Sequence, residues 1–263
     1  MPPRPSRSGS RAAPPRARRE PRVPQDVIFG RHAVLEAARA GRVRRALLAQ
    51  GAGADARLEE LRRLVPVEEV PGERLDQLAQ GTHQGLLAFL RPRTHPSLRD
   101  VLAGGPTLLV ALDGVEDPQN LGAILRSAEA AGADAAILPA RRSAPLSGTT
   151  AKASSGATEL LPICQIAGLP SAVAEIKRHG VWCVALDPRG ELAPWEFDLT
   201  EPVCVVVGGE GAGVHRLVRE RCDARLPLPM AGRIASVNAS AAAAAALYEV
   251  QRQRLAQRLR ADS

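Results

Sequence analysis

Five polar side chains lie in three separate loops, each of which follows a short apolar run. The first loop leads into "NLGAILRS", the second is "GGEGAGV" and the third is "RIASVNAS", and their polar residues are Asn120, Arg126, Glu210, Ser236 and Asn238. Amides and hydroxyls orient a polar ligand, an arginine faces an anion or a hydroxyl, and a carboxylate faces a cation or a hydroxyl. These five residues are the candidates for chemistry.

Each candidate also has a purely structural interpretation. Asn120 is favoured as the N-cap of a helix that starts near it. Helical spacing turns Arg126 away from the stripe of Leu121, Ile124, Leu125 and Ala128, so it is exposed and, by default, solvated. Glu210 is equally a partner for a helix dipole. One of Ser236 and Asn238 caps the alanine-rich final helix, which leaves the other for a ligand.

The glycine-rich loop does not fit a dinucleotide fingerprint. That motif needs glycines at i, i+2 and i+5, and from Gly209 or Gly211 the last position is Val214 or Arg216. A carboxylate at Glu210 would also repel a pyrophosphate. An enzyme linked to NAD or another nucleotide is therefore a disfavoured alternative.

A parallel sheet is expected to position these loops. From residue 107 onward, short apolar runs alternate with helical or glycine-rich segments. This pattern is typical of parallel strands covered on both faces, and ligands bind such sheets at the carboxyl ends of the strands. The loops that start at Asp113, Gly208 and Pro229 lie at that edge.

The pattern divides the chain into four parts. Residues 1–24 form a basic tail that we expect to be disordered, and residues 25–91 read as a small α/β domain. Residues 92–106 form an irregular linker, and residues 107–260 form the larger α/β domain.

Charge and composition narrow the class of partner. The tail holds seven arginines and one glutamate, so most of the chain's net charge of +7 lies there. A basic arm suits contact with a polyanion such as RNA, although a solubilising leader fits the composition equally well. No apolar segment follows the arginines as in a secretory signal, and no apolar run is long enough for a membrane helix, so we expect a cytoplasmic protein.

The four cysteines do not form a metal motif. Cys164, Cys183, Cys204 and Cys222 are widely spaced, and neither a CxxC pair nor clustered histidines accompany them. We expect no metal site and four reduced thiols, mostly buried.

Taken together, the three loops resemble the motifs of the SpoU branch of the SPOUT RNA methyltransferases. The first motif matches Asn120 and Arg126, the second matches Glu210, and the third matches Ser236 and Asn238 in "LPLPMAGRIASVNASAA". The third motif departs slightly, with Ser-Val-Asn-Ala-Ser where the family commonly has Ser-Leu-Asn-Val-Ser. "FGRHAVLEA" and "GTHQGLLA" resemble the family's substrate-binding domain.

The resemblance implies an α/β fold: a C-terminal SPOUT domain with a parallel sheet and a trefoil knot, preceded by a small α/β RNA-binding domain. It implies S-adenosylmethionine as cofactor, held by backbone groups around Gly208, Leu228 and Val237, and it implies a homodimer. Asn120, Ser236 and Asn238 would line the place where the methyl donor meets a ribose. Arg126 would engage the target phosphate or 2′-hydroxyl, and Glu210 would position its polar neighbours.

The implied activity is methylation of a ribose 2′-hydroxyl in RNA. The two-domain layout looks most like the 23S rRNA guanosine 2′-O-methyltransferases. The alternatives are a tRNA 2′-O-methyltransferase, an rRNA methyltransferase that confers resistance to ribosome-binding antibiotics, and a non-catalytic RNA-binding assembly factor that retains the fold.

Overall fold

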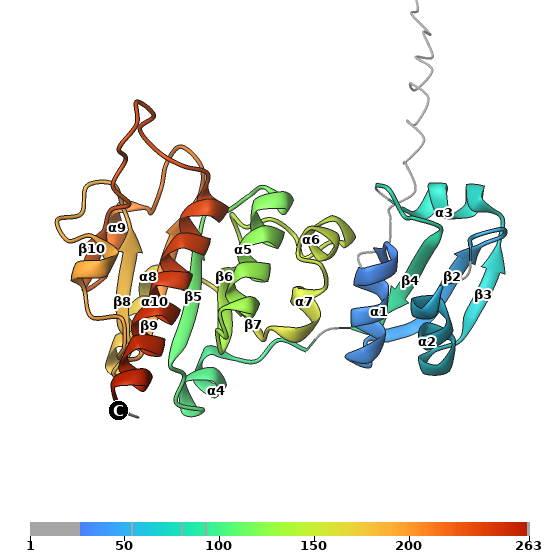
Figure 1. Cartoon of the computed structure of the whole chain (residues 1–263), viewed down its shortest axis with the longest axis horizontal. Coiled ribbons are helices and arrows are strands. Elements are labelled where there is room, and N and C mark those ends of the chain that lie inside the picture. The colour runs from blue at the N-terminus through green and yellow to red at the C-terminus, as the bar shows by residue number, and fades with distance from the viewer. Residues whose placement is uncertain (1–26, 54, 80, 93, 262–263) are drawn as a thin grey trace, which may run out of the picture.

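Two β-sheets follow one another along the chain. The computed structural model describes residues 27–53, 55–79, 81–92 and 94–261, and the predicted tail 1–24 lies outside them. The first sheet has four strands and the second has six. Figure 1 shows each sheet with its own helices. The expected α/β class is confirmed.

The first sheet is mixed and has the strand order β1-β4-β2-β3. Its elements are β1 (Val27–Phe29), α1 (Arg31–Arg39), β2 (Val43–Ala49), α2 (Ala56–Leu64), β3 (Val67–Val70), α3 (Gly72–Leu78) and β4 (Leu86–Leu90). Successive strand residues face opposite sides, so Ile28 and Leu48 pack with α1 and α2. Phe29 and Leu47 pack with Leu75 of α3 on the other face.

The second sheet has the order β10-β8-β9-β5-β6-β7, and all of its strand pairs are parallel. Its strands are β5 (Leu108–Asp113), β6 (Ala135–Pro139), β7 (Ile163–Ile166), β8 (Trp182–Leu186), β9 (Val203–Gly208) and β10 (Ala224–Leu226). They overlap the apolar runs that the sequence shows from residue 107 onward, which confirms the predicted parallel sheet.

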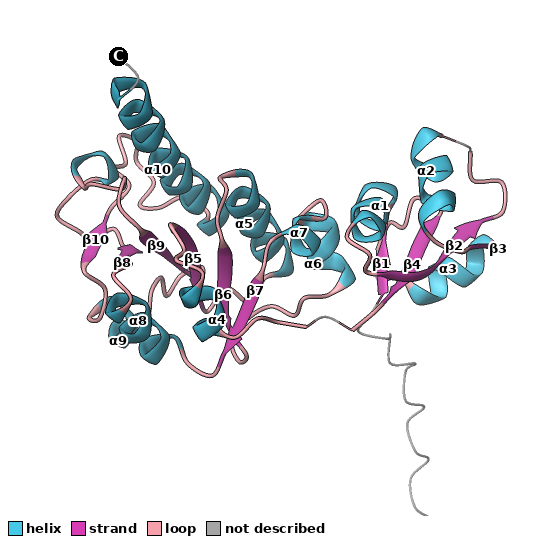
Figure 2. Ribbon diagram, turned by 90° about the horizontal axis from the view of Figure 1, so that it is seen from below, coloured by secondary structure: helices cyan, strands magenta, loops and turns pink. Residues whose placement is uncertain are grey.

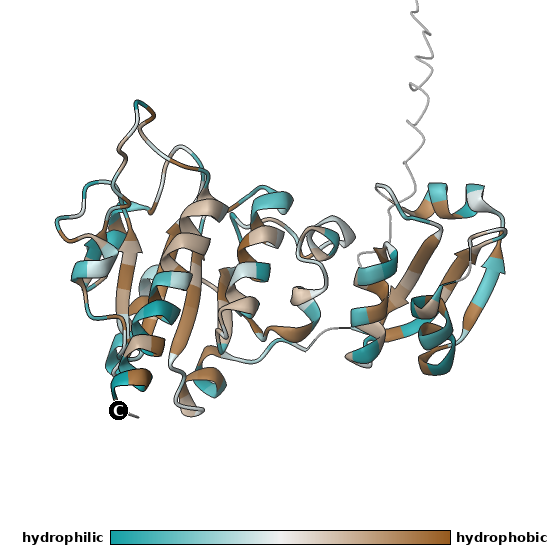
Figure 3. Ribbon diagram, in the orientation of Figure 1, coloured by the Kyte–Doolittle hydropathy of each residue, from teal (hydrophilic) through white to brown (hydrophobic). Residues whose placement is uncertain are grey.

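Helices cover both faces of this sheet (Figure 2). One face carries α5 (Pro118–Ala130) and α10 (Ala239–Ala261), and the other carries α4 (Leu98–Ala103), α8 (Leu169–Arg178) and α9 (Arg216–Arg219). The apolar stripe predicted for α5 is fully buried, and the strands are the most hydrophobic ribbons of the domain (Figure 3). Ala243 and Ala246 are buried, so the alanine run lets α10 pack closely against α5 and β9.

Residues 92–106, expected to form an irregular linker, contain the helix α4. Ser97 and Asp100 form a capping box, in which each side chain accepts a hydrogen bond from the other residue's backbone N–H at 3.2 Å. Leu98 and Leu102 join the core of the second sheet. The helix is only six residues long, so its apolar residues Leu98, Val101 and Leu102 cover little more than one turn and the spacing does not repeat.

The two sheets are joined by contacts of two short helices. These are α6 (Gly148–Ala153), which packs against β1, and α7 (Ala157–Leu160). Arg42, which directly precedes β2, donates a hydrogen bond from Nε to Glu159 of α7 at 2.9 Å. The Glu159 side chain is only 2% exposed. Lys152 Nζ donates to the carbonyl of Thr82 at 2.8 Å.

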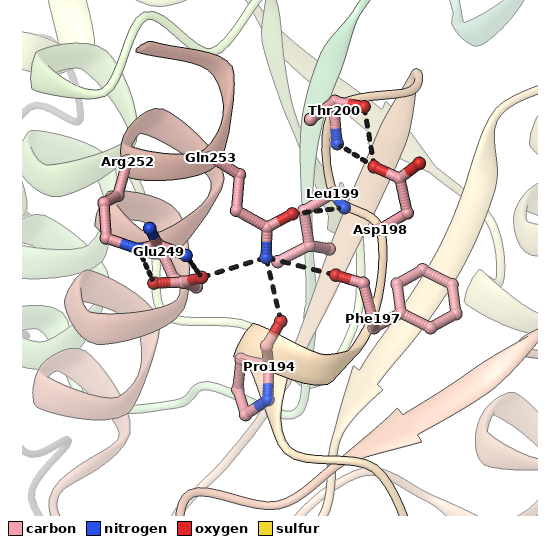
Figure 4. A network of polar contacts seen from close by, with 8 residues as sticks. All are labelled: Pro194, Phe197, Asp198, Leu199, Thr200, Glu249, Arg252 and Gln253. Carbon is pink, nitrogen blue, oxygen red and sulfur yellow. Dashed lines mark hydrogen bonds and ion pairs between the residues drawn. The ribbon is translucent and has the colours of Figure 1, made fainter. Parts of the chain in front are cut away.

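Gln253 of α10 holds the loop that joins β8 to β9 (Figure 4). Its Oε1 accepts from the backbone N–H of Leu199 at 2.9 Å, and its Nε2 donates to the carbonyls of Pro194 and Phe197, both at 3.1 Å. Pro194 opens the short 3-10 helix η1 (Pro194–Glu196). One amide thus satisfies three backbone groups of an irregular segment and fixes that segment on the final helix.

None of the helices in the described part of the chain is long and apolar enough to cross a bilayer. The described residues also contain no group of three or more His, Cys, Asp or Glu side chains that could hold a metal ion. The four cysteines are free, and Cys222 is the one that is only partly buried.

Candidate active site

The three loops meet at one edge of the six-stranded sheet. Asp113 and Gly208 end β5 and β9 and lie opposite each other in the parallel register. Gly209 N–H donates to the Asp113 carbonyl at 2.9 Å, which holds the start of the glycine loop against β5. Residues 227–238 lead from β10 back to α10, whose first residues reach the same edge.

Glycines at the end of β9 allow this close approach. A Cβ atom on Gly209 would lie 2.0 Å from the carbonyl oxygen of Gly114, and one on Gly208 would lie 2.1 Å from the carbonyl carbon of Gly213. Neither position has room for a side chain. The loop is therefore packed as bare backbone, which leaves peptide N–H and C=O groups at the surface of the site.

The side chains of Asn120, Glu210 and Asn238 form a closed hydrogen-bonded cluster. Glu210 Oε1 accepts from Asn120 Nδ2 and from Asn238 Nδ2, both at 2.8 Å. Asn238 Nδ2 also donates to Asn120 Oδ1 at 2.9 Å. We call this the Asn–Glu–Asn cluster. One residue of each of the three sequence motifs thus contributes to a single contact.

The helix caps differ in part from the sequence expectation. Asp117, and not Asn120, is the N-cap of α5, because its side chain accepts from the Asn120 N–H at 2.8 Å while Pro118 occupies the first helical position. Because Asp117 caps the helix, the buried side chain of Asn120 is free to join the cluster. Asn238 caps α10, since its Oδ1 accepts from the Ser240 N–H at 2.8 Å.

A contact that sequence reasoning missed anchors the far end of the glycine loop. Asp113 Oδ2 accepts from the His215 N–H at 2.7 Å, and Asp113 Oδ1 lies 3.0 Å from His215 Nδ1. Asp113 is buried at the end of β5, whereas His215 follows the loop 102 residues later. The signal in the sequence was an aspartate at the end of an otherwise apolar strand.

A pocket of about 430 Å³ lies beside the cluster. Its walls are the ends of β8, β9 and β10, the glycine loop and residues 235–242. Two members of the cluster, Glu210 and Asn238, line it, together with Gly208, Leu228, Ser236 and Val237. Val237 is 39% exposed although it is apolar, and it lines this pocket. No hydrogen-bond partner for the Ser236 hydroxyl is found among the described residues, so it is available to a ligand.

Arg126 does not join this group within one chain. It is exposed on α5, as its helical position predicts, and lines neither the 430 Å³ pocket nor the space around the Asn–Glu–Asn cluster. It stands six positions after Asn120, which is about 9 Å along the helix axis. It can meet a ligand that extends beyond the pocket or a second subunit.

Comparison with known proteins identifies the family. A family model described as the SpoU rRNA Methylase family matches residues 107–248, which is more than half of the chain. The chain belongs to this family. A model described as RNA 2′-O ribose methyltransferase substrate binding matches residues 27–96 of this SpoU methyltransferase.

Relatives of the SpoU methyltransferase agree over most of its length. A TrmH family tRNA/rRNA methyltransferase of Staphylococcus saprophyticus is 37% identical over 238 residues, covering 87% of this chain and 96% of the relative. The crystal structure of the SpoU methyltransferase AviRb from Streptomyces viridochromogenes in complex with AdoMet aligns with a TM-score of 0.76 and 26% identity, over 87% of this chain and 90% of AviRb. A crystal structure of an RNA 2′-O ribose methyltransferase aligns with a TM-score of 0.73 and 30% identity, over 88% and 90%.

The protein is therefore an S-adenosylmethionine-dependent RNA methyltransferase, and its fold implies the trefoil knot expected from the resemblance. The 430 Å³ pocket fits the cofactor, because its volume lies within the range of about 300–1,000 Å³ that is typical of small-molecule sites. Its lining combines apolar side chains, which suit a planar base, with exposed loop backbone, which can hydrogen-bond the base edge. The disfavoured alternative from the sequence, an enzyme linked to NAD or another nucleotide, is therefore excluded as the main activity.

Proposed function

We propose that the protein methylates the 2′-hydroxyl of a ribose in RNA, and that the target is a guanosine of 23S rRNA. The observation that carries the proposal is the Asn–Glu–Asn cluster beside the cofactor-sized pocket. A substrate-binding model for RNA 2′-O ribose methyltransferases matches the N-terminal part, which supports the ribose as the acceptor. In this proposal residues 25–91 bind RNA, residues 107–260 carry out the transfer, and the protein acts as a homodimer in the cytoplasm.

The cofactor would lie in the 430 Å³ pocket and supply an activated methyl group. Backbone groups at Gly208, Leu228 and Val237 would hold its adenine, and the exposed apolar face of Val237 would pack against the ring. Backbone recognition accounts for the scarcity of polar side chains in the glycine loop.

The cluster would position the ribose. Glu210 uses one carboxylate oxygen to fix two amides, so the orientation of Asn120 and Asn238 is set before the substrate binds. The Ser236 hydroxyl would complete the polar wall. Together these groups would aim the 2′-hydroxyl at the methyl carbon.

Arg126 would bind the target phosphate or the 2′-oxygen. A guanidinium retains its protons at ordinary pH, so orientation of the nucleotide and stabilisation of a developing alkoxide suit it better than proton abstraction. Replacing Arg126 with Ala should abolish turnover and leave cofactor affinity in calorimetry unchanged. Retained activity would remove Arg126 from the mechanism.

The target is tested by methylation of total RNA with labelled donor, followed by mapping of the modified nucleotide. We expect the label in 23S rRNA, at the ribose of one guanosine. Relatives named tRNA/rRNA methyltransferases make a tRNA the second candidate. Label found only in tRNA would overturn the ribosomal assignment.

A further inference from the structure

A second groove, of about 530 Å³, continues from the Asn–Glu–Asn cluster along the same edge of the sheet. Its walls come from the loops after β5, β6 and β7 and from α9. A smaller space of about 410 Å³, lined by Asn120 and Glu210, connects with it, because Gly114, Arg142 and His215 line both. We call the larger space the arginine groove, after Arg141, Arg142 and Arg216.

The arginine groove has an excess of positive charge. Arg141 and Arg142 are exposed, and neither has a hydrogen-bond or ion-pair partner among the residues that the structure describes. Arg216 pairs with Glu220 at 2.9 Å, but both side chains are more than half exposed, so this pair is weak. Of the described residues that line the groove, Asp113 alone is a carboxylate, and it is engaged by His215.

The charge changes sign across the connecting space. Glu116 and Asp117 line the connecting space but not the arginine groove. A polyanion whose sugar reaches the Asn–Glu–Asn cluster is repelled by these carboxylates and attracted toward Arg141 and Arg142. The arrangement therefore selects one path for the backbone of a bound strand.

The backbone conformation of Arg142 also points to a functional role for its side chain. Its φ is +59°, in the left-handed region that glycine occupies without strain and that an arginine rarely adopts. A strained residue in an exposed loop beside an active site is a candidate for ligand contact.

We propose that the arginine groove binds the backbone phosphates of the RNA strand next to the target nucleotide, with Arg141 and Arg142 as the main contacts. The proposal rests on the proposed function, since the strand enters the groove from the ribose held at the cluster. Guanidinium groups bind phosphate through paired N–H donors, and single-stranded RNA offers its phosphates one after another along such a groove.

Binding is tested without turnover. The full chain, loaded with S-adenosylmethionine, is titrated into a short fluorescein-labelled single-stranded RNA over a series of KCl concentrations. The variants are Arg141→Ala, Arg142→Gly (which keeps the positive φ) and the double variant. The matched control is Arg178→Ala, an exposed arginine at the opposite end of α8, about 13 Å along the helix from its start beside the groove.

We expect the double variant to weaken RNA binding at least about tenfold at low salt, and to lower the slope of log affinity against log salt by about 0.7 for each lost phosphate contact. Its affinity for S-adenosylmethionine in calorimetry should equal that of the wild type, which shows that it is folded. Arg178→Ala should leave the slope unchanged.

Two results would overturn the proposal: a double variant that binds RNA like the wild type, or a loss in Arg178→Ala as large as that in the double variant, which would indicate general electrostatic attraction without a groove. A wild-type protein that shows the arginine-dependent slope but transfers no methyl group to RNA would contradict the proposed function and leave the groove in place.

Discussion

Asn120 and Glu210 are 90 residues apart in the sequence and are joined by a hydrogen bond of 2.8 Å between Nδ2 and Oε1. The same carboxylate oxygen accepts from Asn238 at 2.8 Å. Because Asn120 is buried and two amides share one oxygen, the geometry of the site depends on Glu210 more than on any other side chain of the cluster.

Removal of the Glu210 carboxylate should therefore impair turnover through geometry. We expect Glu210→Ala to lower kcat about 10- to 100-fold, because the amides lose their common acceptor and shift. Glu210→Gln keeps an acceptor oxygen and should lose less. Steady-state kinetics with labelled donor measure both, with cofactor affinity as the control. Equal and full activity in the two variants would contradict a positioning role.

Asn238 has two roles that can be separated by substitution. Its Oδ1 caps α10, and its Nδ2 belongs to the cluster. Asn238→Ala should lose both and destabilise the protein by about 1 kcal/mol. Asn238→Asp keeps the capping oxygen but places a carboxylate against Glu210, so it should retain the cap and still lose activity. Chemical denaturation and turnover assays on the same preparations test this; an active Asn238→Asp enzyme would show that the cluster is dispensable.

The ion pair between the two sheets should matter for stability. Arg42→Ala leaves the carboxylate of Glu159, which is 2% exposed, without its arginine, and we expect a loss of about 3 kcal/mol in the free energy of unfolding. Arg62→Ala is the control: its partner Glu69 is 2.7 Å away, both side chains are 55% exposed, and the loss should be under about 1 kcal/mol. Urea denaturation measures both losses, and similar losses in the two variants would show that the buried pair stabilises the protein no more than the exposed pair does.

The cysteines should be unreactive in the native protein. Burial raises the pKa of the Cys164 thiol to about 11 and that of Cys222 to about 12, so little of the reactive thiolate forms near neutral pH. We expect slow alkylation by iodoacetamide between pH 7 and 9, and rapid reaction of the cysteines in urea.

The same thiols make stability depend on alkaline pH. A free cysteine has a pKa of about 8.5, so above that pH the unfolded chain has lost protons that the native chain still holds. The free energy of unfolding should therefore fall as the pH rises from about 9 toward 11. Fast alkylation of Cys222 in the native protein at pH 7 would contradict the raised pKa of its thiol.

The sequence predicted the parallel sheet well because its pattern is local. Apolar runs marked all six parallel strands, and the spacing of Leu121, Ile124, Leu125 and Ala128 marked the buried face of α5. The helix cap was misassigned because both Asp117 and Asn120 have capping side chains. Pro118, which favours the first position of a helix, was the signal that points to Asp117.

The site itself depends on contacts that no local pattern encodes. The pairing of Asp113 with His215 and of Asn120 with Glu210 arises only when β9 is inserted beside β5. The arginine groove likewise needs the relative placement of three loops and α9. Motif order gave the candidate residues, and the structure was needed to show which of them touch and that Arg126 lies apart.

The central claim is that the Asn–Glu–Asn cluster presents a ribose oxygen to the methyl donor, and the position of the transferred methyl group tests it most directly. Purified protein is incubated with labelled S-adenosylmethionine and 23S rRNA, the RNA is digested to nucleosides, and the labelled nucleoside is identified by mass spectrometry. We expect 2′-O-methylguanosine, and its loss with Glu210→Ala. A labelled base with an unmodified ribose would contradict it.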